Sequence, residues 1–248
     1  MTKPFDIAGL CVESAPARSR NRTAMLVAPI EPGHSAEAIG VLFELWDSPP
    51  AWFAVPSLDL QPSLAHALVT GAGENLGKQL NSRAAPEALG ALESERKVLY
   101  AGSGAMAVAV VAHAERFAIG WVGTTRAYLV RGGVVEQLTQ EHTLQNDALK
   151  CGVSAEEAAK LPADVLTRVI RMREDGERTP VDVVTRDLQP GDWVVLVTKE
   201  VHRNIDFVEL GGAIAAAESA HAAVALVLGR ALNKSRGHAL GVVVMRRA

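Results

Sequence analysis

This sequence has few cysteines, no long apolar run and little net charge. The two cysteines, Cys11 and Cys151, stand alone without C-x-x-C spacing. Neither a disulfide framework nor a thiolate zinc site is therefore expected, and both thiols are expected to be buried. The longest apolar runs cover residues 105–112 and 222–229, far fewer than the ~20 residues that cross a bilayer. We expect no membrane contact.

Basic and acidic residues are nearly balanced, so the chain has no strong charge of one sign. The chain has 25 basic and 28 acidic residues and a net charge of −3, so no nucleic-acid partner is expected. Residues 1–6 show no charged segment followed by an apolar stretch, so we expect no cleaved secretion signal and a cytoplasmic location. No internal repeat or low-complexity linker divides the chain, and we expect one domain over residues 1–248.

Short apolar runs separated by turn-forming clusters predict an α+β fold with many strands. Strands are predicted at 7–12, 25–30, 41–46, 52–55, 105–111, 116–122, 126–130, 134–138, 181–186, 193–198 and 240–245. Helical patterns predict helices at 61–83, after an N-cap at Ser154, at 165–172 and at 209–232.

Two turn signals connect these strands. Residues 131–133, Arg-Gly-Gly, predict a hairpin between 126–130 and 134–138. Residues 188–192, Leu-Gln-Pro-Gly-Asp, predict a second hairpin between 181–186 and 193–198. We expect two antiparallel sheets packed against each other, with helices outside.

Four short strings follow one another along the second half of the chain. They read Trp-Val-Gly-Thr-Thr-Arg-Ala-Tyr-Leu-Val at 121–130, Gln-Leu-Thr-Gln-Glu-His-Thr at 137–143, Arg-Val-Ile-Arg at 168–171 and Leu-Gln-Pro-Gly-Asp at 188–192. In that order they resemble the "vGDSRaYl", "qLTxDHs", "rnviTRalG" and "LqpGDxllL" strings of the metal-dependent serine/threonine protein phosphatases of the 2C class. The resemblance implies a central β-sandwich with helices on both outer faces.

The resemblance also implies where metal ligands would lie. That family uses aspartates to hold two divalent cations, which activate a water for in-line attack on phosphorus. At the aligned positions this chain carries residues other than aspartate, namely Thr23, Ser57, Leu58, Thr124, Lys199 and Gly237.

A paired metal centre needs several converging anions, because two neighbouring dications repel each other strongly. Lys199 adds repulsion where the family has an aspartate. His142 and His238 lie in matched strings, but no second histidine stands at a ligand-like spacing. We therefore expect no metal or other cofactor and no catalytic residue. The prediction is a pseudophosphatase, a binding or regulatory module for a protein partner in a signalling or assembly pathway.

Two alternatives stay open beside this interpretation. One is a metal-dependent phosphatase with a site rebuilt from other carboxylates, for which the candidates are Glu44, Asp47, Asp59 and Glu200. The other is a phospho-ligand sensor. Arg18 matches the arginine that binds the substrate phosphate in the family, and Arg22 and Lys199 would make the same cleft basic.

Overall fold

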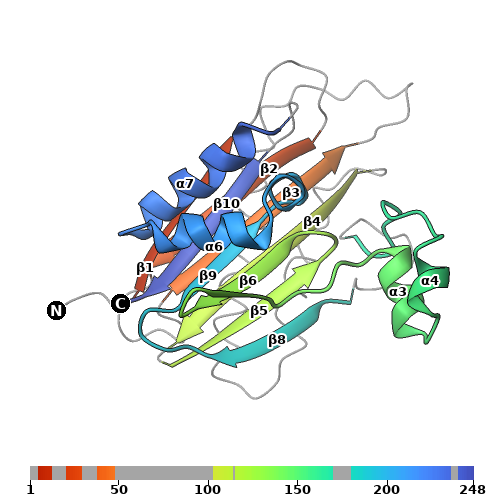
Figure 1. Ribbon diagram of the computed structural model, residues 1–248, viewed down its shortest axis with the longest axis horizontal. Helices are drawn as coiled ribbons and strands as arrows, with labels where there is room; N and C mark the ends of the chain where they lie inside the picture. The colour runs from red at the N-terminus through yellow and green to blue at the C-terminus, as the bar shows by residue number, and fades with distance from the viewer. Residues whose placement is uncertain are drawn as a thin grey trace.

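Two five-stranded sheets form the body of the computed structural model, which describes residues 5–12, 21–29, 38–47, 103–113, 115–169, 180–235 and 240–248. The first sheet has the strand order β1-β10-β9-β6-β7 and the second has the order β2-β3-β4-β5-β8 (Figure 1). The strands are β1 (Phe5–Val12), β2 (Asn21–Pro29), β3 (Ala38–Asp47), β4 (Ser103–His113), β5 (Arg116–Val122), β6 (Arg126–Arg131), β7 (Val134–Gln137), β8 (Asp182–Asp187), β9 (Trp193–Val197) and β10 (Leu240–Arg247). Every pairing between neighbouring strands is antiparallel, as the sequence predicts.

Alternation along the strands divides the first sheet between two cores. In β9, Val194 and Leu196 belong to a core between the two sheets, whereas Trp193, Val195 and Val197 belong to a core under the helices. Because both faces of β9 are covered, the whole strand is buried and apolar.

Helices cover the outer face of the first sheet, where α6 and α7 lie across β9 and β10 (Figure 1). A second group, α3 and α4, lies at one end of the sandwich. The helices are α3 (Leu144–Lys150), α4 (Ala155–Ala158), α5 (Lys199–Asn204), α6 (Phe207–Ala215) and α7 (Ala220–Leu232). Helices therefore flank the sandwich as expected. The helix predicted at 61–83 and the strand at 52–55 lie outside the described residues.

Local capping chemistry sets several helix starts. Ser154 accepts from the backbone N–H of Glu157, which confirms it as an N-cap. Asp206 and Glu209 form a capping box at the start of α6. Ser219 caps α7, so the single helix predicted over 209–232 is wrong and two helices lie there instead.

The hairpin predicted across residues 188–192 is also wrong. The turn itself is present, with Gly191 at φ +86°, but β8 pairs with β5 in the second sheet, whereas β9 pairs with β6 and β10 in the first. The turn residues determine only the local reversal of the chain and not the sheet that each strand joins, so the turn signal could not reveal the crossing. The hairpin at 131–133 is confirmed, because β6 and β7 pair on either side of it.

The helix predicted at 165–172 is wrong over its described part, residues 165–169. Leu166 instead forms an antiparallel bridge with Thr143, and Val165 accepts the backbone N–H of Leu144. Long-range pairing thus satisfies backbone groups that a helix would have used. Cys151 is exposed and Cys11 half-buried, so the expectation of buried thiols is wrong. Within the described residues, no helix is long and apolar enough to cross a membrane.

The two sheets approach each other closely beside Gly40 of β3. A Cβ atom built there would lie 2.8 Å from Val243 Cγ1 and 3.3 Å from Ile7 Cδ1, both in the facing sheet. Gly40→Ala should therefore overpack the interface and lower the free energy of unfolding by about 1–3 kcal/mol in urea denaturation.

Gly229→Ala is the matched control for this substitution. Gly229 lies in α7 with nothing within 4 Å of the added Cβ, so the change should raise stability by about 0.5–1 kcal/mol through helix propensity alone. An equal response of both variants would contradict the close approach of the sheets.

Candidate functional site

Five strands of the two sheets contribute residues to one end of the sandwich. The ends of β3, β5 and β9 lie there together with the starts of β4 and β10. In the register of the second sheet, Glu44 stands between Thr23 of β2 and Met106 of β4. In the first sheet, Thr198 and Gly241 exchange two hydrogen bonds of 3.1 Å. Positions far apart in the sequence are thereby brought to one place.

Glu44 is the buried acid of this end. Its side chain faces the interior, the residue is only 5% exposed, and Oε2 accepts the backbone N–H of Lys199 at 3.1 Å. That N–H belongs to the first turn of α5 and has no partner within the helix. Burial raises the pKa of Glu44, and the hydrogen bond and charge of Lys199 only partly offset this.

The Lys199 side chain points to a different carboxylate. Its ammonium Nζ lies 2.9 Å from Asp164 Oδ1, and the Arg203 guanidinium, one turn along α5, bonds the same oxygen. The hydrogen bond and charge of Lys199 lower the pKa of Asp164, with a further contribution from Arg203. The loop that carries Asp164 is thus tied to α5 by two cations.

Thr124 lies in the connection between β5 and β6 and is 2% exposed. Its hydroxyl donates to Met106 Sδ at 3.1 Å, and its carbonyl lies 2.9 Å from His202 Nε2. The preceding Gly123 has φ +95°, and a Cβ there would lie 2.4 Å from Met106 Cγ. The connection therefore requires glycine and directs Thr124 toward the interior.

A second charged network lies beside Thr124. The carboxylate of Glu141 lies 3.1 Å from Arg126 and 3.2 Å from His202 Nε2. Burial alone would raise the pKa of Glu141, but hydrogen bonds from His202 and Arg126 outweigh it and bring the pKa to about 2. This network joins α5 to the segment after β7 and to the start of β6.

His142 is fully buried and takes part in packing. Its Nδ1 accepts the backbone N–H of Gly123 at 2.9 Å, so the ring proton must be on Nε2, which lies 3.2 Å from Asp182. Arg168 also bonds Asp182 at 2.6 Å. Burial lowers the pKa of His142, and the hydrogen bond to Asp182 offsets this only in part. Both ring nitrogens are thus used inside the protein, and the ring stacks on Trp121.

The structure describes only part of the residue set predicted from sequence. It brings Thr124, Lys199 and Glu44 to one end of the sandwich, and the backbone of Thr23 pairs with Glu44. Glu200 accepts from Asn204 at the end of the same helix, α5. For Arg22 and Asp47 only strand positions are described, and Arg18, Ser57, Leu58, Asp59, Gly237 and His238 lie outside the described residues.

The described donors at this end do not fit a pair of divalent cations. Hard cations need several free carboxylate oxygens that converge. Here Glu44 bonds a backbone N–H, Asp164 bonds two cations, and Glu141 bonds Arg126 and His202. No group of three Asp, Glu, His or Cys side chains suited to a metal occurs in the part of the chain that the structure describes.

Sequence reasoning missed Glu141, Asp164, Asp182 and His202 as members of these networks. Glu141 lies in the matched string at 137–143 and Arg168 begins another, so the strings marked segments that pack here without indicating the partners. Nothing near Asp164 or His202 in the sequence signals a role, because their partners lie 35 or more residues away.

The Glu141 network predicts a pH-dependent stability. Because the folded-state pKa is about 2 and the ordinary pKa of a glutamate is 4.5, the stabilisation is complete above pH 4.5 and is lost as the pH falls toward 2. Glu141→Gln should cost on the order of 3 kcal/mol at pH 7 and much less at pH 3, measured by urea unfolding at both values.

Glu136→Gln is the matched control, because Glu136 lies on β7 with a side chain that is 53% exposed. That variant should change stability little at either pH. A loss for Glu141→Gln that is the same at pH 7 and pH 3 would contradict the lowered pKa.

Comparison of sequences finds one family. Residues 55–148 match the family model "Protein phosphatase 2C". A candidate protein phosphatase 2C-type protein of Streptococcus pyogenes serotype M6 is 37% identical over 79 residues, a segment that spans 30% of each chain.

Comparison of structures extends the similarity to almost the whole chain. A serine/threonine phosphatase of S. agalactiae superposes with a TM-score of 0.70 at 16% identity, covering 98% of this chain and 100% of that one. The catalytic domain of the phosphatase PstP, solved with two manganese ions, gives 0.68 at 16% identity, with 98% and 97% covered. A bacterial serine phosphatase gives 0.73 at 14% identity, with 98% of both chains covered. The matched segment resembles protein phosphatase 2C, and the architecture of this chain is the fold of these metal-dependent serine/threonine phosphatases.

Proposed function

We propose that this chain is a catalytically inactive 2C-class phosphatase-like protein that acts as a binding or regulatory module for a protein partner. The observation that carries the proposal is Lys199, which stands where the resemblance expects a metal-binding aspartate. Its ammonium lies 2.9 Å from Asp164, and its backbone N–H bonds the buried Glu44.

Electrostatics supports the loss of metal-dependent chemistry. A cation at a ligand position repels a dication instead of attracting it, and the two carboxylates that contact Lys199, Glu44 and Asp164, are already bonded within the protein. Thr124, at a second aligned position, uses its hydroxyl on Met106. Without a metal-activated water, phosphoester hydrolysis is too slow for useful turnover.

The retained fold and one exposed surface support a binding role. Phe207 and Val208 are adjacent at the start of α6 and are 50% and 83% exposed. Apolar side chains that stay in water side by side offer contact area to a protein partner. The phosphatase architecture would then serve as the scaffold that presents this surface.

The proposal predicts no manganese-dependent turnover. With p-nitrophenyl phosphate and manganese, phosphate release should equal the rate without protein, and calorimetry should detect no manganese binding. The PstP catalytic domain, whose structure holds two manganese ions, is the positive control. Turnover that a chelator abolishes would overturn the proposal and support a site rebuilt with Glu44, Asp47, Asp59 or Glu200.

A second candidate function, a phospho-ligand sensor, is favoured by the two cations on Asp164. Lys199 and Arg203 both bond Oδ1 of this exposed carboxylate. A phosphate oxygen has the charge and hydrogen-bonding capacity to replace it. Arg18 and Arg22 would extend the basic surface in this proposal.

Substitution of Asp164 should then free Lys199 and Arg203 to bind an anion. Asp164→Asn should bind a phosphoserine peptide about tenfold more tightly than the unmodified chain, and Lys199→Ala and Arg18→Ala should lose binding in calorimetry. Lys160→Ala, which removes an exposed lysine paired with Glu157, is the matched control. No heat at millimolar peptide with Asp164→Asn would exclude this function.

A further inference from the structure

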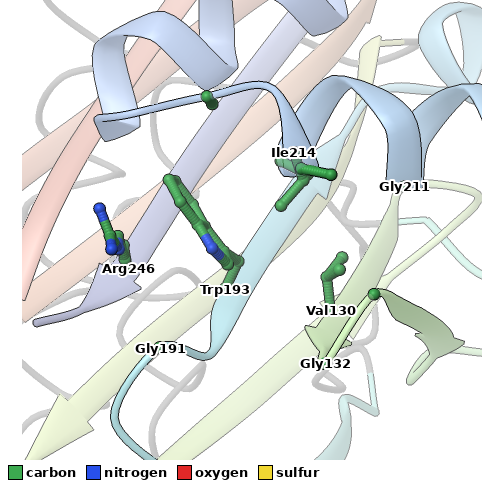
Figure 2. A pocket seen from close by; sticks show the side chains of 10 residues that line it. Val130, Gly132, Gly191, Trp193, Gly211, Ile214 and Arg246 are labelled. Atoms are coloured by element: carbon green, nitrogen blue, oxygen red, sulfur yellow. The ribbon is translucent and has the colours of Figure 1, made fainter.

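A pocket of about 300 Å³ opens on the outer face of the first sheet, beneath the end of α6 (Figure 2). Its lining comes from the end of β6, the start of β9, the end of β10 and the α6–α7 connection. These strand positions lie at the opposite end of the strands from Thr124 and Lys199. The pocket is therefore separate from the site described above.

Missing side chains keep this pocket open. Gly132 and Gly191, in the turns before β7 and β9, have φ of +56° and +86° and line the pocket with backbone alone. Gly211 lines it from α6, where a Cβ would already lie 3.2 Å from Val135 Cγ2. Flat groups can therefore approach the backbone closely along these walls.

The remaining walls are apolar and aromatic. Val130 and Ile214 lie on one side of Trp193, and Arg246 lies on the other (Figure 2). Trp193 and Arg246 are cross-strand partners on β9 and β10, and the guanidinium lies 4.9 Å from the centre of the indole ring. A cation thus stands directly beside an apolar space.

Arg246 has no carboxylate partner among the described residues. Within that part of the chain its guanidinium donates to the carbonyl of Glu218 at 3.0 Å, and its Nε is buried without a partner. Asp6 is its neighbour on β1, but that carboxylate accepts the backbone N–H of Ala220 at 2.6 Å at the start of α7. The guanidinium therefore faces no carboxylate in this region, and a bound anion would supply the missing counter-charge.

We propose that this pocket binds a small monoanion with a flat apolar body, of the aromatic carboxylate class. The carboxylate would pair with Arg246, and the ring would lie among Trp193, Val130 and Ile214. One guanidinium beside an apolar space suits a single negative charge and not a polyphosphate. The inference is independent of the proposed function, because no residue of the Glu44–Lys199 end takes part.

Calorimetry with cinnamate and its uncharged amide, cinnamamide, tests both halves of the proposal on the full chain. Cinnamate should bind with a submillimolar dissociation constant and cinnamamide about tenfold or more weakly, because the amide cannot pair with the guanidinium. Arg246→Gln should weaken cinnamate by a similar factor and leave cinnamamide unchanged.

A blocking variant covers the case in which Arg246→Gln does not fold. Ala215 lines the pocket and is exposed, so Ala215→Phe should fill the opening and abolish binding of both compounds. Ala216→Phe adds the same ring one residue later, at an exposed position outside the lining, and should bind cinnamate normally. No binding by the unmodified chain at millimolar cinnamate, equal affinity for the amide, or equal binding by both phenylalanine variants would overturn the proposal.

Discussion

The hydrogen bond between the buried Glu44 carboxylate and the backbone N–H of Lys199 joins the two sheets at one end of the sandwich. A carboxylate this deeply buried is tolerated only with a partner, and the first turn of a helix has N–H groups to spare. The bond therefore fixes where α5 begins relative to β3. The Lys199 ammonium bonds Asp164 instead.

The position of α5 in turn determines the surrounding charge networks. His202, on the same helix, meets both the Thr124 carbonyl and Glu141, and Glu141 continues to Arg126. The three described carboxylates Glu44, Glu141 and Asp164 are each bonded to a protein cation or an N–H group. This end of the sandwich is held together by internal hydrogen bonds and ion pairs.

The opposite end of the same strands has a different character. There, positive-φ turns and small residues leave space, and Arg246 stands beside Trp193 without an acidic partner among the described residues. One end thus satisfies its charges internally, whereas the other leaves a cation available. Binding chemistry in this chain is accordingly expected at two places with different physical requirements.

Prediction from sequence succeeded where the signal is local and failed where it depends on distant partners. The pattern of apolar residues predicted most strands correctly. Ser154 indicated the start of a helix, and the glycines at 132 and 133 indicated a hairpin. The turn at 188–192 looked the same locally, yet it carries the chain from one sheet to the other. Residues 165–169 read as helical but pair with Thr143 and its neighbours, because a backbone partner outside the segment was available.

The sequence by itself determined the α+β class and the antiparallel strands, and it has Lys199 and Thr124 where the resemblance expects metal ligands. Only the tertiary structure decided that Lys199 would bond Asp164, that Glu44 would be buried against α5, and that Arg246 would lack a carboxylate in the described region. The reason is physical. Turn and strand preferences are properties of a few consecutive residues, whereas burial, pKa and ion pairing depend on groups that folding brings together from distant parts of the chain.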